Sequence, residues 1–542
     1  MLAGDDTCVD VMCKTLAAAI LLLLTFAAPA HADAIMRITS ESWSAADERG
    51  YGEFIAAIGE SNCRTVAQCI AHPSNPFRAS DPPGFTFHAD CADLPYFLRF
   101  YYAWKRGLPF SYVREVSPRG RSRDIRYSAR GNQVEARRDV LTGDNALRLL
   151  NNLRDQISSA TYRIHPELGG DDLYSPALDP RSIRPGTVIY DPNGHLAVIY
   201  RIERDGRIRY IDAHPDNSLT RGTYDLRFVR ASPGMGAGFK NWRPARLVGA
   251  SRAPDGALVG GRIMLASNAQ IPDFALTQFF GTEYLKMSPR PADSQWRNGA
   301  FVLGDAVMDY YDFVRASLSG GRLRFNPLRE ITDMVLSNCA DLSYRAEAVD
   351  IALAAGIQNR PQPDRLPPNI YGTEGDWETY STPSRDARLK TAFKEVRDYA
   401  ERFLTLWRTR DARLVYNGFD LAGDMLAAHD RAAASCAISY RRSDGSQVRF
   451  GYEEARRRLF RLSFDPYHCV ERRWGADGAE GATCRDGPLK RRWYEAEARL
   501  RNQLDRSYEA RMDFTLSELE EGRGGISSPP DTDTAAFLRA RR

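Results

Sequence analysis

Apolar residues follow a helical period in the segment from residue 93 to residue 104. They recur at steps of three and four, at Leu94, Phe97, Leu98, Tyr101 and Tyr102. This is the spacing of one face of an amphipathic helix. Asp90 is a favoured N-cap residue, and Pro95 is tolerated only in the first turn of a helix. We therefore expect a helix that begins close to Cys91.

Apolar and β-branched residues predict three short strands, about a hundred residues further along. The runs cover residues 187–190, 194–200 and 207–214. The turn Asp191-Pro192-Asn193-Gly194 separates the first two runs. Asp205-Gly206, a strong hairpin signal, separates the second run from the third. The pattern predicts an antiparallel meander.

The hairpin signal also predicts which residues face each other. If Asp205-Gly206 forms a two-residue turn, Ala197 lies opposite His214. Side chains alternate along a strand, so His195, Asp212 and His214 then share one face.

Cys91 and His195 are the residues that carry candidate chemistry. A cysteine at a helix start followed by a histidine on a strand is the order of nucleophile and base in a papain-like thiol enzyme. The helix dipole would favour the thiolate and lower the pKa of Cys91. His214 or Asp212 would orient the imidazole, and the predicted register favours His214. The alternative for Cys91 is a small buried hydrophobe or half of a disulfide.

Several short motifs resemble the NlpC/P60 and CHAP branch of papain-like hydrolases. They are Asp90-Cys91, Pro185-Gly186 and Gly194-His195-Leu196-Ala197-Val198, within residues 85–220. The resemblance implies an α+β fold in which a Cys-bearing helix packs on a small antiparallel sheet. It also implies a cell-wall peptidase or amidase that cleaves peptidoglycan stem peptides without a cofactor. The chain departs from the family at Thr187, where an aspartate is usual, and at Ala92-Asp93, where Ser-Gly is usual.

Two other functions remain open at this point. Cys91-Ala92-Asp93, with Arg106-Gly107-Leu108-Pro109 further along, is similar to transglutaminase-like enzymes. Their third catalytic residue is an aspartate, which favours Asp212 over His214. A non-catalytic periplasmic binding or scaffold protein with a papain-like shell is the third candidate.

The N-terminus predicts export. The apolar run 16–26 follows Lys14, and Ala30-His31-Ala32 fits a cleavage site, so residues 1–32 are predicted to be a secretory signal peptide. The mature protein would then be secreted or periplasmic, without a stable membrane anchor.

Seven of the nine cysteines follow the predicted cleavage site. The pairs expected are Cys63 with Cys69, Cys339 with Cys436, and Cys469 with Cys484. Cys91 is then the free thiol. A metal site is not predicted, because no close Cys/His quartet has zinc spacing.

The length of 542 residues allows more than one core. We expect a catalytic domain over 33–250, a connector over 251–320, a mostly helical domain over 321–521 and a disordered tail over 522–542. The clearest helical patterns cover 331–356, 385–408 and 489–521. A net charge of +4 gives no support for nucleic-acid binding. Cys339-Ala340-Asp341-Leu342 repeats the motif at Cys91, and we interpret the repeat as chance.

Overall fold

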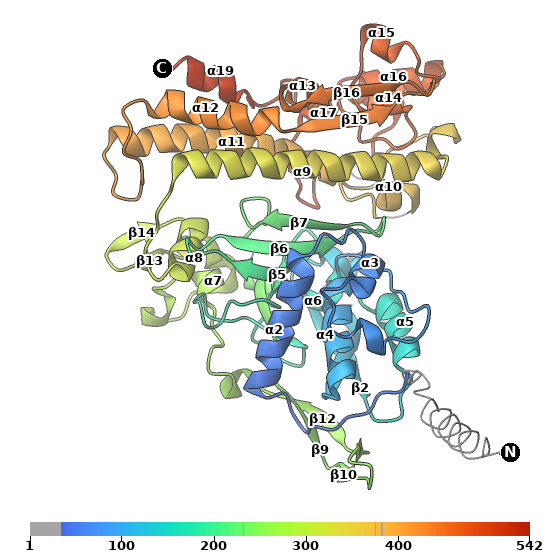
Figure 1. Cartoon of the computed structure of the whole chain (residues 1–542), viewed down its shortest axis with the longest axis vertical. Coiled ribbons are helices and arrows are strands. Elements are labelled where there is room, and N and C mark those ends of the chain that lie inside the picture. Colours follow the sequence, from blue (N-terminus) through green and yellow to red (C-terminus); the bar gives the residue numbers. More distant parts are fainter. Residues whose placement is uncertain (1–33, 231, 374, 381–382) are drawn as a thin grey trace, which may run out of the picture.

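The computed structural model describes residues 34–230, 232–373, 375–380 and 383–542 (Figure 1). The predicted signal peptide, residues 1–32, lies outside the described residues. The chain has an α+β fold, as predicted, with one six-stranded sheet and several two-stranded ones. In Figure 1 the long helices α9, α11 and α12 lie side by side above strand β7, which forms one edge of the large sheet.

The large sheet has the strand order β3-β8-β4-β5-β6-β7, and every neighbouring pair is antiparallel. Its strands are β3 (Leu173–Tyr174), β4 (Val188–Tyr190), β5 (Leu196–Ile202), β6 (Ile208–Ala213), β7 (Leu219–Thr223) and β8 (Gly238–Trp242). Strands β4, β5 and β6 are the predicted meander.

Side chains alternate between two cores along β5. Leu196 belongs to the core beneath α4 (Asp93–Arg106), the predicted amphipathic helix. Ala197 belongs to a second core on the opposite face, which is covered by α8 (Tyr310–Leu318). The sheet is therefore buried on both faces, which explains why its strands read as continuous apolar runs.

Other elements surround the sheet. The N-terminal part also contains α2 (Ala45–Glu60), α3 (Val66–Ala71), α5 (Ala146–Gln156), α6 (Ser159–Tyr162) and the hairpin of β1 (Phe110–Pro118) and β2 (Asn132–Val140). Next come β9 (Ala245–Val248), β10 (Ser251–Arg252), β11 (Leu258–Val259), β12 (Arg262–Leu265), α7 (Thr277–Phe280), β13 (Phe301–Leu303) and β14 (Ala306–Met308).

The β5–β6 hairpin does not have the predicted register. Its loop is three residues long, because the Glu203 amide donates to the Arg207 carbonyl at 2.8 Å. Gly206 has a φ of 83°, and a Cβ there would lie 2.0 Å from the Arg315 carbonyl oxygen of α8. A second shift occurs at the bulge between Ile199 and Arg201. Two one-residue shifts keep His195 and Asp212 on one face, as predicted, but move each strand residue to a new partner.

Residues 251–320, which were expected to be a connector, contain β10 to β14, α7 and α8. Phe313 and Val314 of α8 are buried against Ile189 and Ile199 of the sheet. Leu178, Ile183 and Phe228, from within residues 33–250, belong to the same core. A protein cut near Ala250 would lose the part of this core that α8 contributes.

The C-terminal half is mostly helical, as predicted. Its elements are α9 (Pro327–Ala354), α10 (Gly375–Tyr380), α11 (Pro383–Arg408), α12 (Leu421–Ala434), β15 (Ala437–Arg441), β16 (Gln447–Gly451), α13 (Tyr452–Arg458), α14 (Val470–Arg473), α15 (Gly478–Gly481), α16 (Pro488–Ala496), α17 (Ala498–Asn502), α18 (Leu516–Glu520) and α19 (Thr534–Arg539). The patterns at 331–356 and 385–408 correspond to α9 and α11.

Two predictions for the C-terminal end were wrong. The single helix expected over 489–521 is three short helices, because Met512 and Phe514 leave the helical path to fill a separate core. The tail expected to be disordered contains α19, whose Phe537 and Leu538 are buried in the main helical core. The conformation of both segments is therefore determined by which of their side chains are buried in the tertiary structure.

All three predicted disulfides are present: Cys63–Cys69, Cys339–Cys436 and Cys469–Cys484. Disulfides of this kind are typical of oxidising compartments. Within the described ranges, no helix has an apolar stretch long enough to cross a bilayer.

Replacing Cys339 and Cys436 together by alanine is expected to lower the free energy of unfolding by about 2–5 kcal/mol. The two residues are 97 positions apart, and closing a long loop removes the most entropy from the unfolded chain. The control is the double alanine variant of Cys63 and Cys69, which are only 6 positions apart. Urea unfolding should show a smaller loss of unfolding free energy for this control than for the Cys339 and Cys436 double variant. Equal losses would contradict the loop-length argument.

Candidate active site

Cys91 lies in the turn directly before α4. Oδ1 of Asp90 accepts hydrogen bonds from the amides of Ala92 (2.8 Å) and Asp93 (3.0 Å) and so stabilises the turn before α4, although the N-cap residue is Ala92 rather than Asp90 as predicted. The Tyr162 hydroxyl donates to the Ala92 carbonyl at 2.6 Å and holds the turn from outside. These bonds fix the backbone that carries the thiol.

His195 and Asp212 form a direct pair. Nε2 of His195 lies 2.7 Å from Oδ2 of Asp212, and Asp212 is only 1% exposed. The Thr220 hydroxyl on β7 donates to Oδ1 of the same carboxylate. Because a carboxylate only accepts, His195 carries its proton on Nε2 and keeps a lone pair on Nδ1.

His214 is next to this pair but does not bond to His195. Its Nε2 is 3.0 Å from the Thr220 hydroxyl oxygen and 3.8 Å from Oδ2 of Asp212. The two imidazole rings stack with centroids 5.8 Å apart. The preference for His214 as the orienting residue depended on the two-residue turn. The structure instead puts Asp212 against His195. Continuing the observed pairing of Val198 with Ile211 sets Asp212 opposite Ala197 and His214 opposite His195, so it is the hydrogen bond rather than the register that selects Asp212.

The thiol lies beside the backbone at His195 rather than on its ring. Sγ of Cys91 donates to the Gly194 carbonyl oxygen at 3.8 Å, and the half-buried side chain packs against the core beneath α4. The His195 ring lies 6.1 Å from the Phe228 ring, which belongs to the opposite core. Within the described residues, Sγ and the imidazole share no hydrogen bond. The contact needed for proton transfer is therefore not made in this conformation.

Burial raises the pKa of the Cys91 thiol well above its usual range, and the negative charge of Asp90 adds to this effect. The prediction of a low pKa was wrong, because desolvation outweighs the helix dipole. Burial, with the nearby Arg388, lowers the pKa of His195 to about 4. Burial also opposes ionisation of Asp212, but His214 and His195 outweigh it and hold the Asp212 pKa below its usual range. At neutral pH the site holds a neutral thiol, a neutral imidazole and a carboxylate.

Iodoacetamide is expected to alkylate Cys91 slowly at pH 7, about tenfold or more below free cysteine, and faster at alkaline pH. A raised pKa leaves little thiolate at neutral pH, and the other cysteines of the described ranges are in disulfides. Peptide mass spectrometry of the native, non-reduced protein identifies the labelled residue, with Cys91→Ala as the control. Fast labelling at pH 7 would show that the thiolate forms despite burial.

No protein-family model, curated protein or solved structure matches this chain. The assignment of the site depends on its own geometry. The pairing of His195 with buried Asp212, next to the only described cysteine outside a disulfide, is the observation that any function must explain.

The helical half covers the imidazole side of the site. A cavity of about 70 Å³ separates β6 and β7 from α9 and α11. Its lining combines acidic, aromatic and basic side chains, with the arginines Arg221, Arg227, Arg345, Arg385 and Arg388. Nη1 of Arg388 lies 3.9 Å from Oδ2 of Asp212, and Nη2 lies 3.4 Å from the Tyr210 hydroxyl. A cation from α11 therefore adjoins the carboxylate that holds His195.

Sequence reasoning missed three residues of this site: Thr220, Phe228 and Arg388. Thr220 follows the predicted meander on the next strand, so continued alternation could have indicated it. Arg388 lies on a helix far along the chain, and no local pattern connects it with His195.

The repeated motif at Cys339 has none of this geometry. Cys339 lies inside α9 rather than at a helix start, and it is paired with Cys436. Asp341 of the same motif instead accepts from Arg227 at 2.8 Å and lines the cavity. It contributes to the contact between the two halves.

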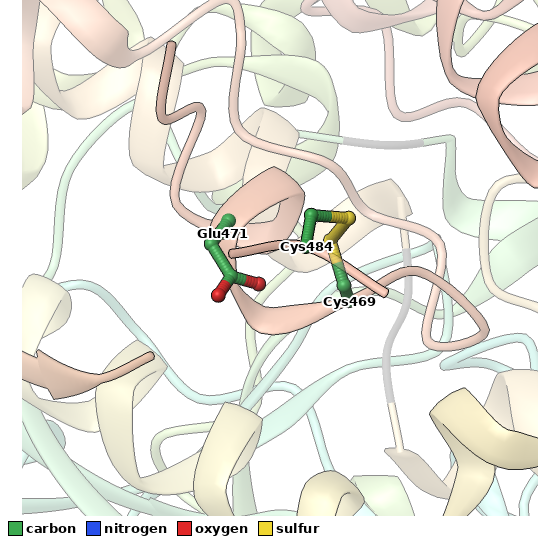
Figure 2. Close-up of side chains that lie close together, drawn as sticks. All are labelled: Cys469, Glu471 and Cys484. Atoms are coloured by element: carbon green, nitrogen blue, oxygen red, sulfur yellow. A yellow bond between two sulfur atoms is a disulfide. The ribbon is translucent and has the colours of Figure 1, made fainter. Parts of the chain in front are cut away.

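Cys469, Glu471 and Cys484 also come close together (Figure 2). The two cysteines form a disulfide, so neither offers a thiolate to a metal ion. Glu471 accepts from the Ser443 amide at 2.7 Å and from the hydroxyls of Ser443 and Thr483. The cluster is satisfied by its own bonds.

Proposed function

We propose that the protein is an exported cysteine hydrolase that cleaves amide or peptide bonds by thiol acyl transfer. The observation that carries the proposal is the arrangement of Cys91, His195 and Asp212. The free thiol hydrogen-bonds the carbonyl that precedes His195, and the imidazole is held by a buried carboxylate. The same arrangement, with the Cys-bearing helix on one face of an antiparallel sheet, supports the proposal of a papain-like fold.

The proposed reaction begins from neutral groups. The Cys91 sulfur attacks the amide carbonyl while its proton passes to Nδ1 of His195, once substrate binding brings the two side chains together. Asp212 keeps the proton on Nε2 and stabilises the imidazolium that forms. The imidazolium then protonates the leaving amine, and water hydrolyses the thioester.

The Cys91 amide is a candidate donor to the oxyanion. Among the described residues, no group accepts from it, whereas the amides of Ala92 and Asp93 are taken by Asp90. A free N–H at a helix start is suited to the developing negative charge of a tetrahedral intermediate.

The proposed substrate is a peptidoglycan stem peptide. The resemblance to NlpC/P60 enzymes supports it, and so does the arginine-lined cavity beside Asp212 and His214. Stem peptides carry free carboxylates, which guanidinium groups bind well. The three disulfides support a periplasmic or secreted location, where such a substrate is found.

A transglutaminase-like activity is the second candidate. The His195–Asp212 pair favours it, because the third residue of that branch is an aspartate. The two activities share the acyl-enzyme step and differ in whether water or an amine completes the reaction.

The test is mass spectrometry of purified muropeptides after incubation with the mature protein. Release of a free amine without any added amine supports the hydrolase. Ammonia release that depends on an added amine supports transglutamination. Stoichiometric binding of muropeptide without turnover would reject both enzymes in favour of a scaffold.

A further inference from the structure

Three buried side chains meet in the C-terminal half, far from Cys91. Asp465 and His468 precede α14, and Glu497 lies at the junction of α16 and α17. Each offers one potential ligand atom, and these atoms lie within 4.8 Å of one another. All three residues are 0% exposed. Two carboxyl groups and an imidazole therefore share one site without access to bulk water.

Glu497 is the unusual member of this cluster. Neither of its carboxyl oxygens accepts a hydrogen bond from an N–H or hydroxyl group, and the closest ion-pair contact is Nη1 of Arg501, 3.8 Å from Oε2. Its one side-chain hydrogen bond is with the carboxyl group of Asp465, and that bond requires a proton on one of the two groups. An ionised carboxylate buried without partners costs several kcal/mol or more. A structure that keeps such a group needs a compensating charge at the same place.

Gln362 adds a second unsatisfied oxygen beside the cluster. Its side-chain amide donates to Oδ2 of Asp465 at 2.7 Å, while its own Oε1 is buried without a partner. The region around Asp465 therefore contains more acceptor oxygen atoms than hydrogen-bond donors.

His468 has an oxygen atom of the protein close to each of its ring nitrogens. Its Nδ1 lies 2.7 Å from the Ser463 hydroxyl oxygen, and its Nε2 lies 3.9 Å from Oδ2 of Asp465. Metal-bound imidazoles typically use one nitrogen for the ion and the other for an oxygen of the protein. Because a carbonyl oxygen only accepts, Nε2 carries the proton in the metal-free chain and donates to the Lys490 carbonyl oxygen at 3.1 Å, while Nδ1 accepts from the Ser463 hydroxyl. A metal ion can bind Nε2 only after this proton leaves, and the Lys490 carbonyl oxygen is then a further oxygen at the site.

We propose that Asp465, His468 and Glu497 bind one divalent first-row metal ion, with Zn²⁺ as the best match. Two carboxylates balance the charge of a divalent ion, and an imidazole with carboxylate oxygens is a usual ligand set for zinc. The metal connects the segment before α14 with the α16–α17 junction. Its role is structural, because the site is closed to substrate. The proposal does not depend on the activity proposed for Cys91.

The competing explanation is a shared proton. Burial, and then the charge of Asp465, raise the pKa of Glu497 well above its usual range. A proton between the two carboxyl groups would also remove the excess charge. Metal binding displaces this proton, so the two explanations differ in metal content.

The experiment measures metal content and thermal stability of the full mature chain, kept non-reduced. The protein is stripped with EDTA, incubated with Zn²⁺, dialysed and analysed by inductively coupled plasma mass spectrometry. We expect about one zinc ion per chain and a higher Tm than for the stripped protein. Glu497→Gln and His468→Gln should each lower the zinc content at least about tenfold.

Glu471→Gln is the matched control. Glu471 is equally buried and lies in the same region, but both oxygens of its carboxylate accept hydrogen bonds. The Glu471→Gln variant should keep the zinc content of the wild type, even if its Tm falls. Zinc below about a tenth of an ion per chain in the reconstituted wild type would overturn the proposal. So would equal zinc content in wild type, Glu497→Gln and His468→Gln. The wild-type measurement decides the matter if either variant fails to fold.

Discussion

Replacing Cys91 by alanine is expected to abolish amine release from muropeptides, with a loss in kcat of about six orders of magnitude. The sulfur is the atom that forms the acyl-enzyme in the proposed reaction, and no other described cysteine is outside a disulfide. Mass spectrometry of the reaction products measures the loss. The substitution removes one half-buried atom, so the thermal unfolding of the variant should stay close to that of the wild type.

Cys91→Ser is the matched variant for this experiment. It preserves the shape of the side chain and replaces only the nucleophilic atom. It should be nearly as inactive as the alanine variant, because a neutral hydroxyl is a much weaker nucleophile than a thiol. Full turnover by a folded Cys91→Ala protein would remove Cys91 from the reaction and leave the His195–Asp212 pair without a nucleophile.

Asp212→Asn is expected to lower kcat by about 10³- to 10⁴-fold, the second largest effect. The variant keeps the size of the side chain but no longer provides the charge that lies 2.7 Å from Nε2 of His195. The amide can also donate to Nε2, which would favour the wrong tautomer of the imidazole. KM should change little, because Asp212 acts through His195 rather than on the substrate.

His214→Gln is the comparison for Asp212→Asn. His214 reaches the same carboxylate only at 3.8 Å, and its hydrogen bond goes to Thr220. We expect a loss of about tenfold or less in kcat. A steady-state analysis of both variants gives the ranking. A larger loss in His214→Gln than in Asp212→Asn, with both proteins folded, would contradict the assignment of Asp212 as the residue that orients His195.

Much of the site followed from local patterns. The period of Leu94 and Phe97 indicated the Cys-bearing helix, and alternation along the meander put His195 and Asp212 on one face. Nearness in the sequence suggested two of the cysteine pairs, Cys63–Cys69 and Cys469–Cys484, and the third pair joined cysteines that remained. These signals are local, because helix period, strand period and turn residues depend on neighbours in the sequence.

The third residue of the site could not be predicted in the same way. Two shifts, at the Gly206 loop and at the bulge before Arg201, bring Asp212 two residues closer to His195 than the predicted turn would, and they bring His214 closer as well. The loop is constrained by α8, whose Arg315 carbonyl leaves no room for a side chain at position 206. A contact from a hundred residues further on cannot be read from the hairpin itself, and each one-residue shift changes every facing pair.

The pKa of Cys91 was mispredicted for a related reason. The sequence indicated where the helix starts, but it did not indicate how deeply the Cys91 thiol is buried. Tyr162 and the core beneath α4 come from separate segments, and their packing desolvates the thiol. Burial is a property of the whole fold, so its balance against the helix dipole could not be judged from the residues around position 91.

The position of Arg388 on α11 has a consequence for the order in which the protein becomes complete. Synthesis proceeds from the N-terminus, so the chain already contains Cys91, His195 and Asp212 long before α11 exists. Until α11 docks, the imidazole lacks the neighbouring guanidinium that helps to lower its pKa. A nascent or truncated chain would therefore present a more easily protonated His195 than the finished protein. The set of charged groups that acts on the pKa of His195 is complete only after the last third of the sequence has been made and has docked.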